Sequence, residues 1–161
     1  MVFEDIACKS DDEKYMLEAM MEAADAAGTG EVPVGAVIVM DGAIIARAHN
    51  LVETELRSSA HAEMLAIEQA ERALGYKWLT GATMYVTLEP CSMCAGAMVL
   101  ARIGRLVYGA SDPKNGACGS AVNVAANQNL THRMEIEGGV LGAECSAQLT
   151  EFFREMRRAR K

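Results

Sequence analysis

Two short motifs constrain the fold of this chain more than any other feature. His61-Ala62-Glu63 supplies one imidazole and one carboxylate, and Pro90-Cys91-Ser92-Met93-Cys94 supplies two thiols thirty residues further on. One histidine and two cysteines suit zinc, and a catalytic zinc site uses three protein ligands and keeps the fourth position open. The chain must therefore fold so that two distant segments meet, with Glu63 beside them as a carboxylate that the metal does not need.

The cysteine spacing predicts that the second motif opens a helix. Cys91 and Cys94 are three residues apart, which places them on one face of a helix. Pro90 suits a helix start, because its missing N–H would be unpaired there in any case. The positive end of the helix dipole is expected to lower the pKa of both thiols and to favour the thiolates that bind metal.

The first motif is expected to open a second helix, over residues 62–74. Ser58 and Ser59 precede it and are candidate capping residues. On an ideal helix the side chains of His61 and Glu63 point in different directions. They can face one water molecule only at the first turn, where side chains project from the helix end.

The charges of these groups predict separate roles for them. Two thiolates and a neutral imidazole cancel the charge of zinc, so this site polarises water less than an all-histidine site does. A base is then needed beside the metal, and Glu63 is the candidate. Glu63 can also return a proton to a substrate and to its leaving group.

Other interpretations of the same residues stay open at this point. Cys91 and Cys94 could form a redox dithiol. Cys118 could instead complete a closed, structural zinc site as a fourth ligand. A zinc-stabilised RNA-binding module without turnover is a further alternative, although it leaves Glu63 without a role.

Length and composition limit the class of protein. The 161 residues suffice for one domain with a substantial core, spanning residues 1–161. No apolar run reaches membrane-spanning length, and residues 1–5 lack the basic flank and apolar stretch of a signal peptide. The remaining cysteines are expected to be free thiols in a reducing compartment, namely Cys8, Cys118 and Cys145. We therefore expect a cytoplasmic protein without membrane partners.

The charge distribution is uneven. The net charge of −7 argues against broad, non-specific binding of nucleic acid. Residues 154–161, however, hold five basic side chains and one acid. This basic end of the chain could form a local phosphate-binding patch, or it could be a solvated helix end whose charges complement the dipole.

Apolar periodicity and turn signals predict alternating helices and strands. Helices are expected over residues 11–27, 62–74, 91–102 and 121–126 and from 144 onward, and strands over 34–39, 43–48, 83–87, 105–108 and 134–136. Asp41-Gly42 is a strong two-residue hairpin signal, and residues 50–59 are expected to form a loop. Strand–helix–strand units with short connections predict parallel pairing within a mixed sheet that helices flank.

Longer stretches resemble a known enzyme family. Glu-Val-Pro-Val-Gly-Ala-Val at 31–37, the motif at 61–63 and Thr-Leu-Glu-Pro-Cys-Ser-Met-Cys-Ala-Gly-Ala-Met at 87–98 resemble the bacterial tRNA-specific adenosine deaminases. The likeness runs from about residue 11 to the C-terminus and includes Phe-Phe-Arg at 152–154. The His-x-Glu and Pro-Cys-x-x-Cys spacing alone is shared by zinc-dependent nucleobase deaminases in general.

The resemblance implies a fold and a reaction. The fold would be cytidine deaminase-like, an α/β fold of three layers (α/β/α) around a five-stranded mixed sheet. The reaction would be hydrolysis of adenosine to inosine at the wobble position of a tRNA anticodon stem-loop, in a homodimer. His61, Cys91 and Cys94 would bind one zinc ion per chain, and Glu63 would move protons.

The resemblance also implies substrate-binding residues, which are Asn50, Val32, Leu88, Asp112, Lys114 and Phe153. Asn50 would hydrogen-bond the flipped base, between apolar walls from Val32 and Leu88. Asp112 and Lys114 would approach the anticodon backbone, and Phe153 would belong to a tail that packs near the RNA.

Structural roles stay open for some of these side chains. Asn50 could cap a strand end, Asp112 could open a turn before Pro113, and Phe153 could belong to the core. Arg-Ser-Ser at 57–59 and Ala121 depart from residues common in the family, so RNA contacts there are not carried over. The alternative function is a deaminase of a free base or nucleoside, such as guanine or cytosine, which would not need the basic tail.

Overall fold

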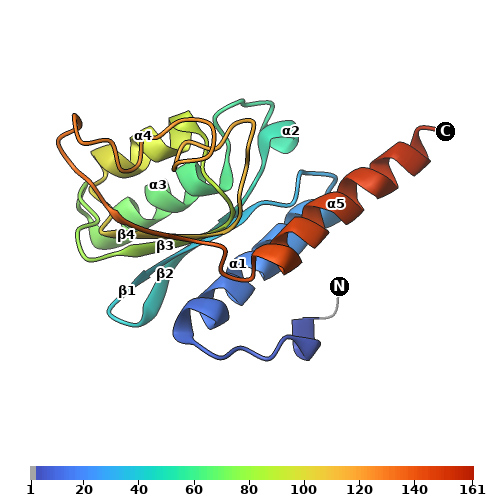
Figure 1. Ribbon diagram of the computed structural model, residues 1–161, viewed down its shortest axis with the longest axis horizontal. Coiled ribbons are helices and arrows are strands. Elements are labelled where there is room, and N and C mark those ends of the chain that lie inside the picture. Colours follow the sequence, from blue (N-terminus) through green and yellow to red (C-terminus); the bar gives the residue numbers. More distant parts are fainter. Residues whose placement is uncertain (1–2) are drawn as a thin grey trace.

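The sheet begins with the hairpin that Asp41-Gly42 predicts. In the computed structural model, which describes residues 3–161, β1 (Gly35–Met40) and β2 (Ala43–His49) pair antiparallel (Figure 1). Asp41 and Gly42 have φ angles of 51° and 76°. Positive φ at both central residues is what a two-residue type I′ turn requires, so the hairpin prediction is confirmed. Met1 and Val2, the first residues of the stretch expected to lack signal-peptide features, lie outside the described residues.

Within residues 3–161, five strands form one mixed sheet in the order β2-β1-β3-β4-β5. The central strand β3 (Thr83–Leu88) is antiparallel to β1 and parallel to β4 (Arg105–Ala110), and β4 is parallel to β5 (Glu135–Gly138). The expected five-stranded mixed sheet and its parallel pairing across a helical connection are therefore confirmed.

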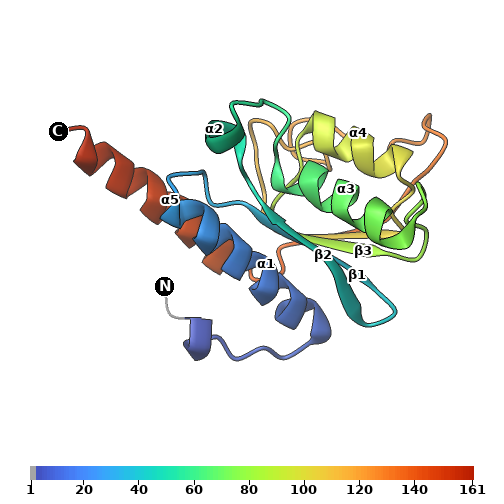
Figure 2. The same cartoon turned by 180° about the vertical axis from the view of Figure 1, so that it is seen from behind.

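Helices cover both faces of this sheet, as Figures 1 and 2 show. One face carries α1 (Asp11–Gly28) and α5 (Gly142–Ala159), and the other carries α3 (Ala62–Leu74) and α4 (Ser92–Leu100). Successive strand residues point to opposite faces. Ile38 and Met84 accordingly pack under α3 and α4, whereas Val37 and Tyr85 pack under α1. The strands are apolar on both faces because both faces are covered, which confirms the three-layer α/β/α arrangement.

A polar network fixes α1 to the middle of the sheet. Asp12, in the first turn of α1, accepts hydrogen bonds from both terminal nitrogens of Arg105 at 2.7 and 2.8 Å. Its Oδ1 atom also accepts the hydroxyl proton of Tyr85 at 2.7 Å. Asp12 therefore joins α1 to β3 and β4 through two side chains.

Two expectations for the loops are wrong. Residues 50–59 include a short helix, α2 (Val52–Glu55), and residues 121–126 form no helix. The backbone N–H groups of Ala121 and Val122 donate to the carbonyl of Gly116 instead, at 2.9 and 3.1 Å. Backbone hydrogen bonds to a preceding turn thus replace the i→i−4 bonds that the alanine-rich composition favours.

The remaining elements are close to their expected positions. A single 3₁₀ turn, η1 (Phe3–Asp5), precedes α1, and α5 starts two residues before the predicted position 144. Within residues 3–161, no helix combines the length and the apolar character that crossing a membrane requires.

Candidate functional site

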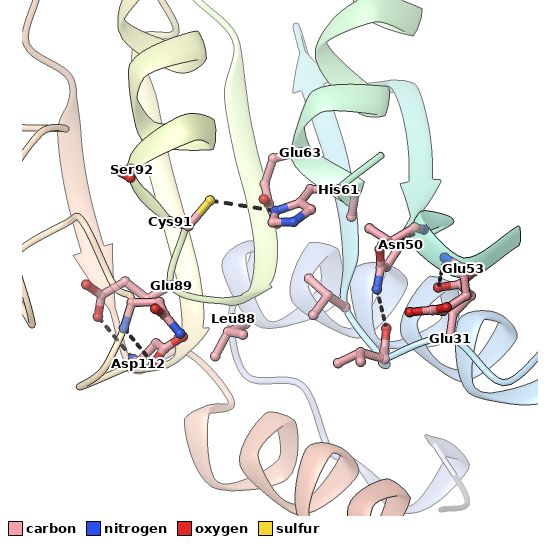
Figure 3. A pocket seen from close by; sticks show the side chains of 15 residues that line it. Glu31, Asn50, Glu53, His61, Glu63, Leu88, Glu89, Cys91, Ser92 and Asp112 are labelled. Atoms are coloured by element: carbon pink, nitrogen blue, oxygen red, sulfur yellow. Dashed lines mark hydrogen bonds between the residues drawn. The ribbon is translucent and has the colours of Figure 1, made fainter. Parts of the chain in front are cut away.

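Helices α3 and α4 begin side by side at the carboxyl end of the sheet's central strand. His61 is the N-cap residue of α3 and Cys91 is the N-cap residue of α4, and both have extended backbone angles. Neither side chain caps its own helix. The expected cap from Ser58 or Ser59 is wrong, because the chain turns helical only after His61. The imidazole and the thiol face each other instead (Figure 3).

Three potential metal ligands converge at this point. The Nδ1 atom of His61 lies 3.6 Å from Sγ of Cys91 and 3.5 Å from Sγ of Cys94. All three ligand atoms lie within 4.8 Å of one another. Cys118 is not a member of this group, and its Sγ lies 4.0 Å from the carbonyl oxygen of Pro90. The arrangement therefore offers a three-ligand metal site in which a fourth position is left for a small molecule.

The pKa values of the two thiols shift in opposite directions. Hydrogen bonds from Cys94 and His61 lower the pKa of Cys91 to about 4. The hydrogen bond to Cys91, together with burial, raises the pKa of Cys94. The helix dipole alone predicts that both values fall, so this expectation is wrong for Cys94. A divalent cation would displace the proton that Cys94 keeps, because cysteine binds metal as a thiolate.

Glu63 is a buried carboxyl group beside these ligands. It lies in the first turn of α3, and only 3% of its surface is exposed. Burial raises its pKa to about 7. A carboxyl that titrates near neutral pH can both accept and donate a proton, which is the property that general acid–base catalysis needs.

A cavity of about 490 Å³ opens beside Glu63 and the metal ligands. This volume is within the range of small-molecule sites. Figure 3 shows two walls, with Glu31, Asn50 and Glu53 on one side and Leu88 and Asp112 on the other. The cavity is lined by Glu31, Val32, Val34, Asn50, Val52, Glu53, His61, Ala62, Glu63, Leu88, Glu89, Cys91, Ser92, Asp112 and Asn115.

Four of the six expected substrate-binding residues line the cavity, namely Val32, Asn50, Leu88 and Asp112. Lys114 is exposed on the adjoining loop and does not line it. Phe153 lies on α5, 42% exposed, with its ring 5.4 Å from the buried ring of Phe152. Phe153 therefore belongs neither to the core nor to the cavity wall.

Asn50 and Asp112 also have the structural roles that their residue types favour. Oδ1 of Asn50 accepts the backbone N–H of Val52 at 3.2 Å. Oδ1 of Asp112 accepts the N–H groups of Lys114 and Asn115, both at 3.1 Å. Each side chain thus stabilises a turn while it faces the cavity.

Sequence reasoning missed two buried carboxylates, Glu31 and Glu89. Glu89 accepts backbone N–H groups from Asp112, Cys118 and Ser120 at 3.3, 3.1 and 3.2 Å, and it also accepts the Ser120 hydroxyl proton. Glu89 thereby ties the loop at 112–120 to the segment that connects β3 with α4. The sequence signal for Glu89 was an acidic residue directly before Pro90, in a segment (87–98) otherwise rich in apolar and small residues.

The known proteins that this chain resembles are deaminases. The family model described as MafB19-like deaminase matches residues 10–157. The tRNA-specific adenosine deaminase of Bacillus subtilis (strain 168) is 56% identical over 150 residues, which cover 93% of each chain. A solved structure from a study of A-to-I editing by tRNA:A34 deaminases at the wobble position is 44% identical with a TM-score of 0.82, over 84% of this chain and 99% of that chain. Guanine deaminase from Bacillus subtilis is 39% identical with a TM-score of 0.61, over 63% of this chain and 66% of its own.

Proposed function

Because the chain belongs to the family of tRNA-specific adenosine deaminases, we propose that it converts adenosine to inosine at the wobble position of a tRNA anticodon. The observation that carries this proposal is the convergence of three metal ligands and a buried carboxyl group on one cavity. The tRNA-specific adenosine deaminase of Bacillus subtilis is 56% identical over 93% of this chain, whereas the guanine deaminase of Bacillus subtilis is 39% identical over 63% of it. The proposed unit is a single deaminase domain.

We propose zinc as the ion, one per chain, with His61, Cys91 and Cys94 as its ligands. One imidazole and two thiols are a donor set that suits zinc. When bound, zinc would supply Lewis-acid activation of a water molecule.

Glu63 would carry the protons of the reaction. Its carboxylate accepts a proton from the attacking water and delivers it to N1 of the adenine ring, as the oxygen adds to C6. The hydroxyl group now on C6 gives its proton through Glu63 to the exocyclic nitrogen. The C6–N bond breaks as the C6=O bond forms, and ammonia leaves. A pKa of about 7 for Glu63 supports this role, since proton transfer in both directions is then feasible near neutral pH.

The cavity walls would hold the flipped base. The apolar side chains of Val32 and Leu88 line the cavity and suit the faces of a purine ring. Asn50 would hydrogen-bond the base edge. Asp112 and Lys114, at the rim and on the adjoining loop, would approach the anticodon backbone.

The C-terminal end of α5 would bind RNA outside the cavity. Figure 1 shows that this end of α5 projects beyond the rest of the molecule. It carries Phe153 and the basic residues of the last turn, including Arg157 and Arg158. Exposed guanidinium groups on a projecting helix suit contact with phosphates.

We also propose a homodimer that works in the cytoplasm, where its tRNA substrate would be found. Two apolar side chains on α4 support the dimer, since Met93 is 37% exposed and Leu100 is 80% exposed. Light scattering in solution should give twice the chain mass. A monomer at micromolar concentration would contradict this part of the proposal.

The substrate is tested by ammonia release. The zinc-loaded protein is incubated with an anticodon stem-loop that has adenosine at the wobble position, and separately with adenosine, guanine and cytosine. We expect ammonia and inosine from the stem-loop alone, and none from a stem-loop whose only adenosine is moved by one nucleotide. Ammonia from guanine would support the alternative function, and RNA binding without ammonia would support a non-catalytic module.

A further inference from the structure

Glu31 is a fully buried carboxylate at the edge of the cavity, and no step of the proposed reaction uses it. Oε1 accepts the backbone N–H of Thr54 at 2.6 Å and the Thr54 hydroxyl proton at 2.9 Å, and Oε2 accepts the N–H of Glu53 at 3.2 Å. Burial raises the pKa of Glu31, but these hydrogen bonds outweigh it and hold the pKa below its usual value. The side chain is therefore a buried charge that is fully engaged with α2.

Helix α2, which donates hydrogen bonds to Glu31, is too short to be stable by itself. α2 has four residues, and its N-cap residue, Leu51, has no side chain able to accept an N–H. A helix this short is unstable without outside contacts. Side chains from outside α2 pair with its first three N–H groups, since Asn50 accepts from Val52 and Glu31 accepts from the next two residues.

This arrangement determines which end of the Asn50 amide faces the cavity. Because Oδ1 of Asn50 accepts the N–H of Val52, its Nδ2 atom points the other way and donates one hydrogen to the carbonyl oxygen of Val32 at 3.4 Å. Figure 3 shows the Asn50 amide directed along this wall of the cavity. The reversed amide would set its NH2 group against the N–H of Val52, which is repulsive. The second hydrogen of this NH2 group is the donor that Asn50 can offer to a base, and a ring nitrogen of a purine is a matching acceptor.

We propose that Glu31 is a positioning residue for base recognition: it fixes the first turn of α2, and through the Val52 N–H it holds the Asn50 amide with its donor toward the base. This inference rests on the proposed function in one respect, namely that Asn50 contacts the base. Glu31 itself does not touch the substrate.

A double-mutant cycle tests whether Glu31 acts through Asn50. The variants are Glu31→Gln, Asn50→Ala and both together, with kcat and KM measured on the stem-loop. Glutamine keeps the size of Glu31, but its NH2 group cannot accept an N–H. We expect each single change to lower kcat/KM on the order of tenfold, the loss that corresponds to one hydrogen bond. In the Asn50→Ala background, Glu31→Gln should not lower kcat/KM any further. The metal content should be the same in all variants.

The controls separate positioning from general destabilisation. Thr54→Val removes one hydroxyl contact of Glu31 but keeps both backbone donors, so kcat/KM should change less than about twofold. Glu31→Asp keeps the charge on a shorter side chain and serves as the second variant if Glu31→Gln does not fold. Additive losses of kcat/KM would overturn the proposal, whether Glu31→Gln or Glu31→Asp is combined with Asn50→Ala. The effect of a residue that only stabilises the fold does not depend on Asn50.

Hydrogen exchange tests the same contact without any substrate. Backbone N–H groups of Val52, Glu53 and Thr54 should exchange faster in Glu31→Gln than in the wild type, while those of α3 keep their rates. Unchanged exchange at these three positions would overturn the proposal. If the wild type shows this difference from Glu31→Gln but does not deaminate the stem-loop, the proposed function fails and the role of Glu31 in α2 stands.

Discussion

His61 and Cys91 occupy the same position in two different helices, and each turns its side chain toward the other instead of capping its own helix. The Nδ1 and Sγ atoms are 3.6 Å apart. An N-cap side chain commonly accepts an N–H of its own first turn, and losing that bond costs roughly 1 kcal/mol. Both helices therefore lack a stabilising contact at the place where the proposed metal ligands meet.

Replacing Glu63 by glutamine should abolish turnover and leave metal binding intact. The change keeps the shape of the side chain and removes its ability to accept a proton, which typically lowers a rate by about 10² to 10⁴. The measurements are kcat on the stem-loop and zinc content. Glu68→Gln is the matched control, since Glu68 lies on the same helix with an exposed side chain paired to Arg72. Near-normal kcat in Glu63→Gln would refute the proton-transfer role.

Replacing Cys118 by serine should leave one zinc ion per chain. Cys118 stands outside the group formed by His61, Cys91 and Cys94, so its thiol is not required for coordination. Metal analysis of the purified variant measures this, and Cys91→Ser should lose zinc in the same assay. Zinc loss in Cys118→Ser would mean that the site is a closed, structural one.

Replacing Arg157, Arg158 and Arg160 by glutamine should weaken stem-loop binding and flatten its salt dependence. Each lost phosphate contact lowers the slope of log affinity against log salt by about 0.7 for single strands. We expect kcat at saturating RNA to change little, since the tail lies outside the cavity. The measurement is KM at several salt concentrations.

Arg72→Gln is the control for the salt series, because Arg72 already pairs with Glu68 and has no predicted phosphate contact. Equal slopes in the wild type and the triple variant would show that the basic tail is only a solvated helix end. The assignment of tRNA as the substrate would then rest on family membership alone.

Replacing Gly116 by alanine should displace the loop that Glu89 holds. A Cβ atom at this position would meet the carboxylate of Glu89 and would lie 2.5 Å from the carbonyl oxygen of Asp112. Overpacking of this kind costs about 1–3 kcal/mol, so we expect KM for the stem-loop to rise by roughly tenfold or more. Gly28→Ala, at an open position at the end of α1, should have no such effect. An unchanged KM in Gly116→Ala would show that the position of this loop does not affect RNA binding.

Replacing Asp12 by asparagine should destabilise the fold at neutral pH and have less effect in acid. The hydrogen bond from Arg105 is the main reason that the pKa of Asp12 lies below its usual value of 3.8. A lowered pKa stabilises the folded state above pH 4, and this contribution is lost as the pH falls through the lowered value. We expect a loss of about 1–3 kcal/mol in the free energy of unfolding at pH 7.

Urea unfolding at pH 7 and at pH 3 measures this difference. Asp11→Asn is the matched control, because the neighbouring Asp11 side chain is 82% exposed and pairs with Lys14 at the surface. A loss of the same size at both pH values would show that the Asp12 charge is not responsible.

The sequence predicts the elements well where local signals and packing agree. Helix α3 has the predicted bounds because its apolar spacing is regular and Gly75 ends it in the left-handed conformation. Residues 121–126 have the composition of a helix, yet their N–H groups bond to carbonyls at 116 and 117. Tertiary hydrogen bonds of this kind leave no periodic trace in a sequence.

The site was predictable to a similar extent. His61, Cys91 and Cys94 lie close together, as the spacing predicts, in a group that could hold a metal ion. The roles of Glu31 and Glu89 were not predictable, since each carboxylate accepts backbone N–H groups from residues 22 to 31 positions away. Backbone donors look the same in every residue type, so only the folded chain reveals which acid they meet.

The location of the ligands on two separate helices has a consequence for unfolding. An ion bound by His61 and Cys91 would cross-link the chain and close a loop of thirty residues that contains α3 and the central strand β3. Because these ligand atoms lie together only in the folded chain, the free energy of binding the ion adds to the stability of the fold. Chelation should therefore lower the melting temperature as well as the activity, and the purified protein should lose its ion and its central strand in one cooperative step.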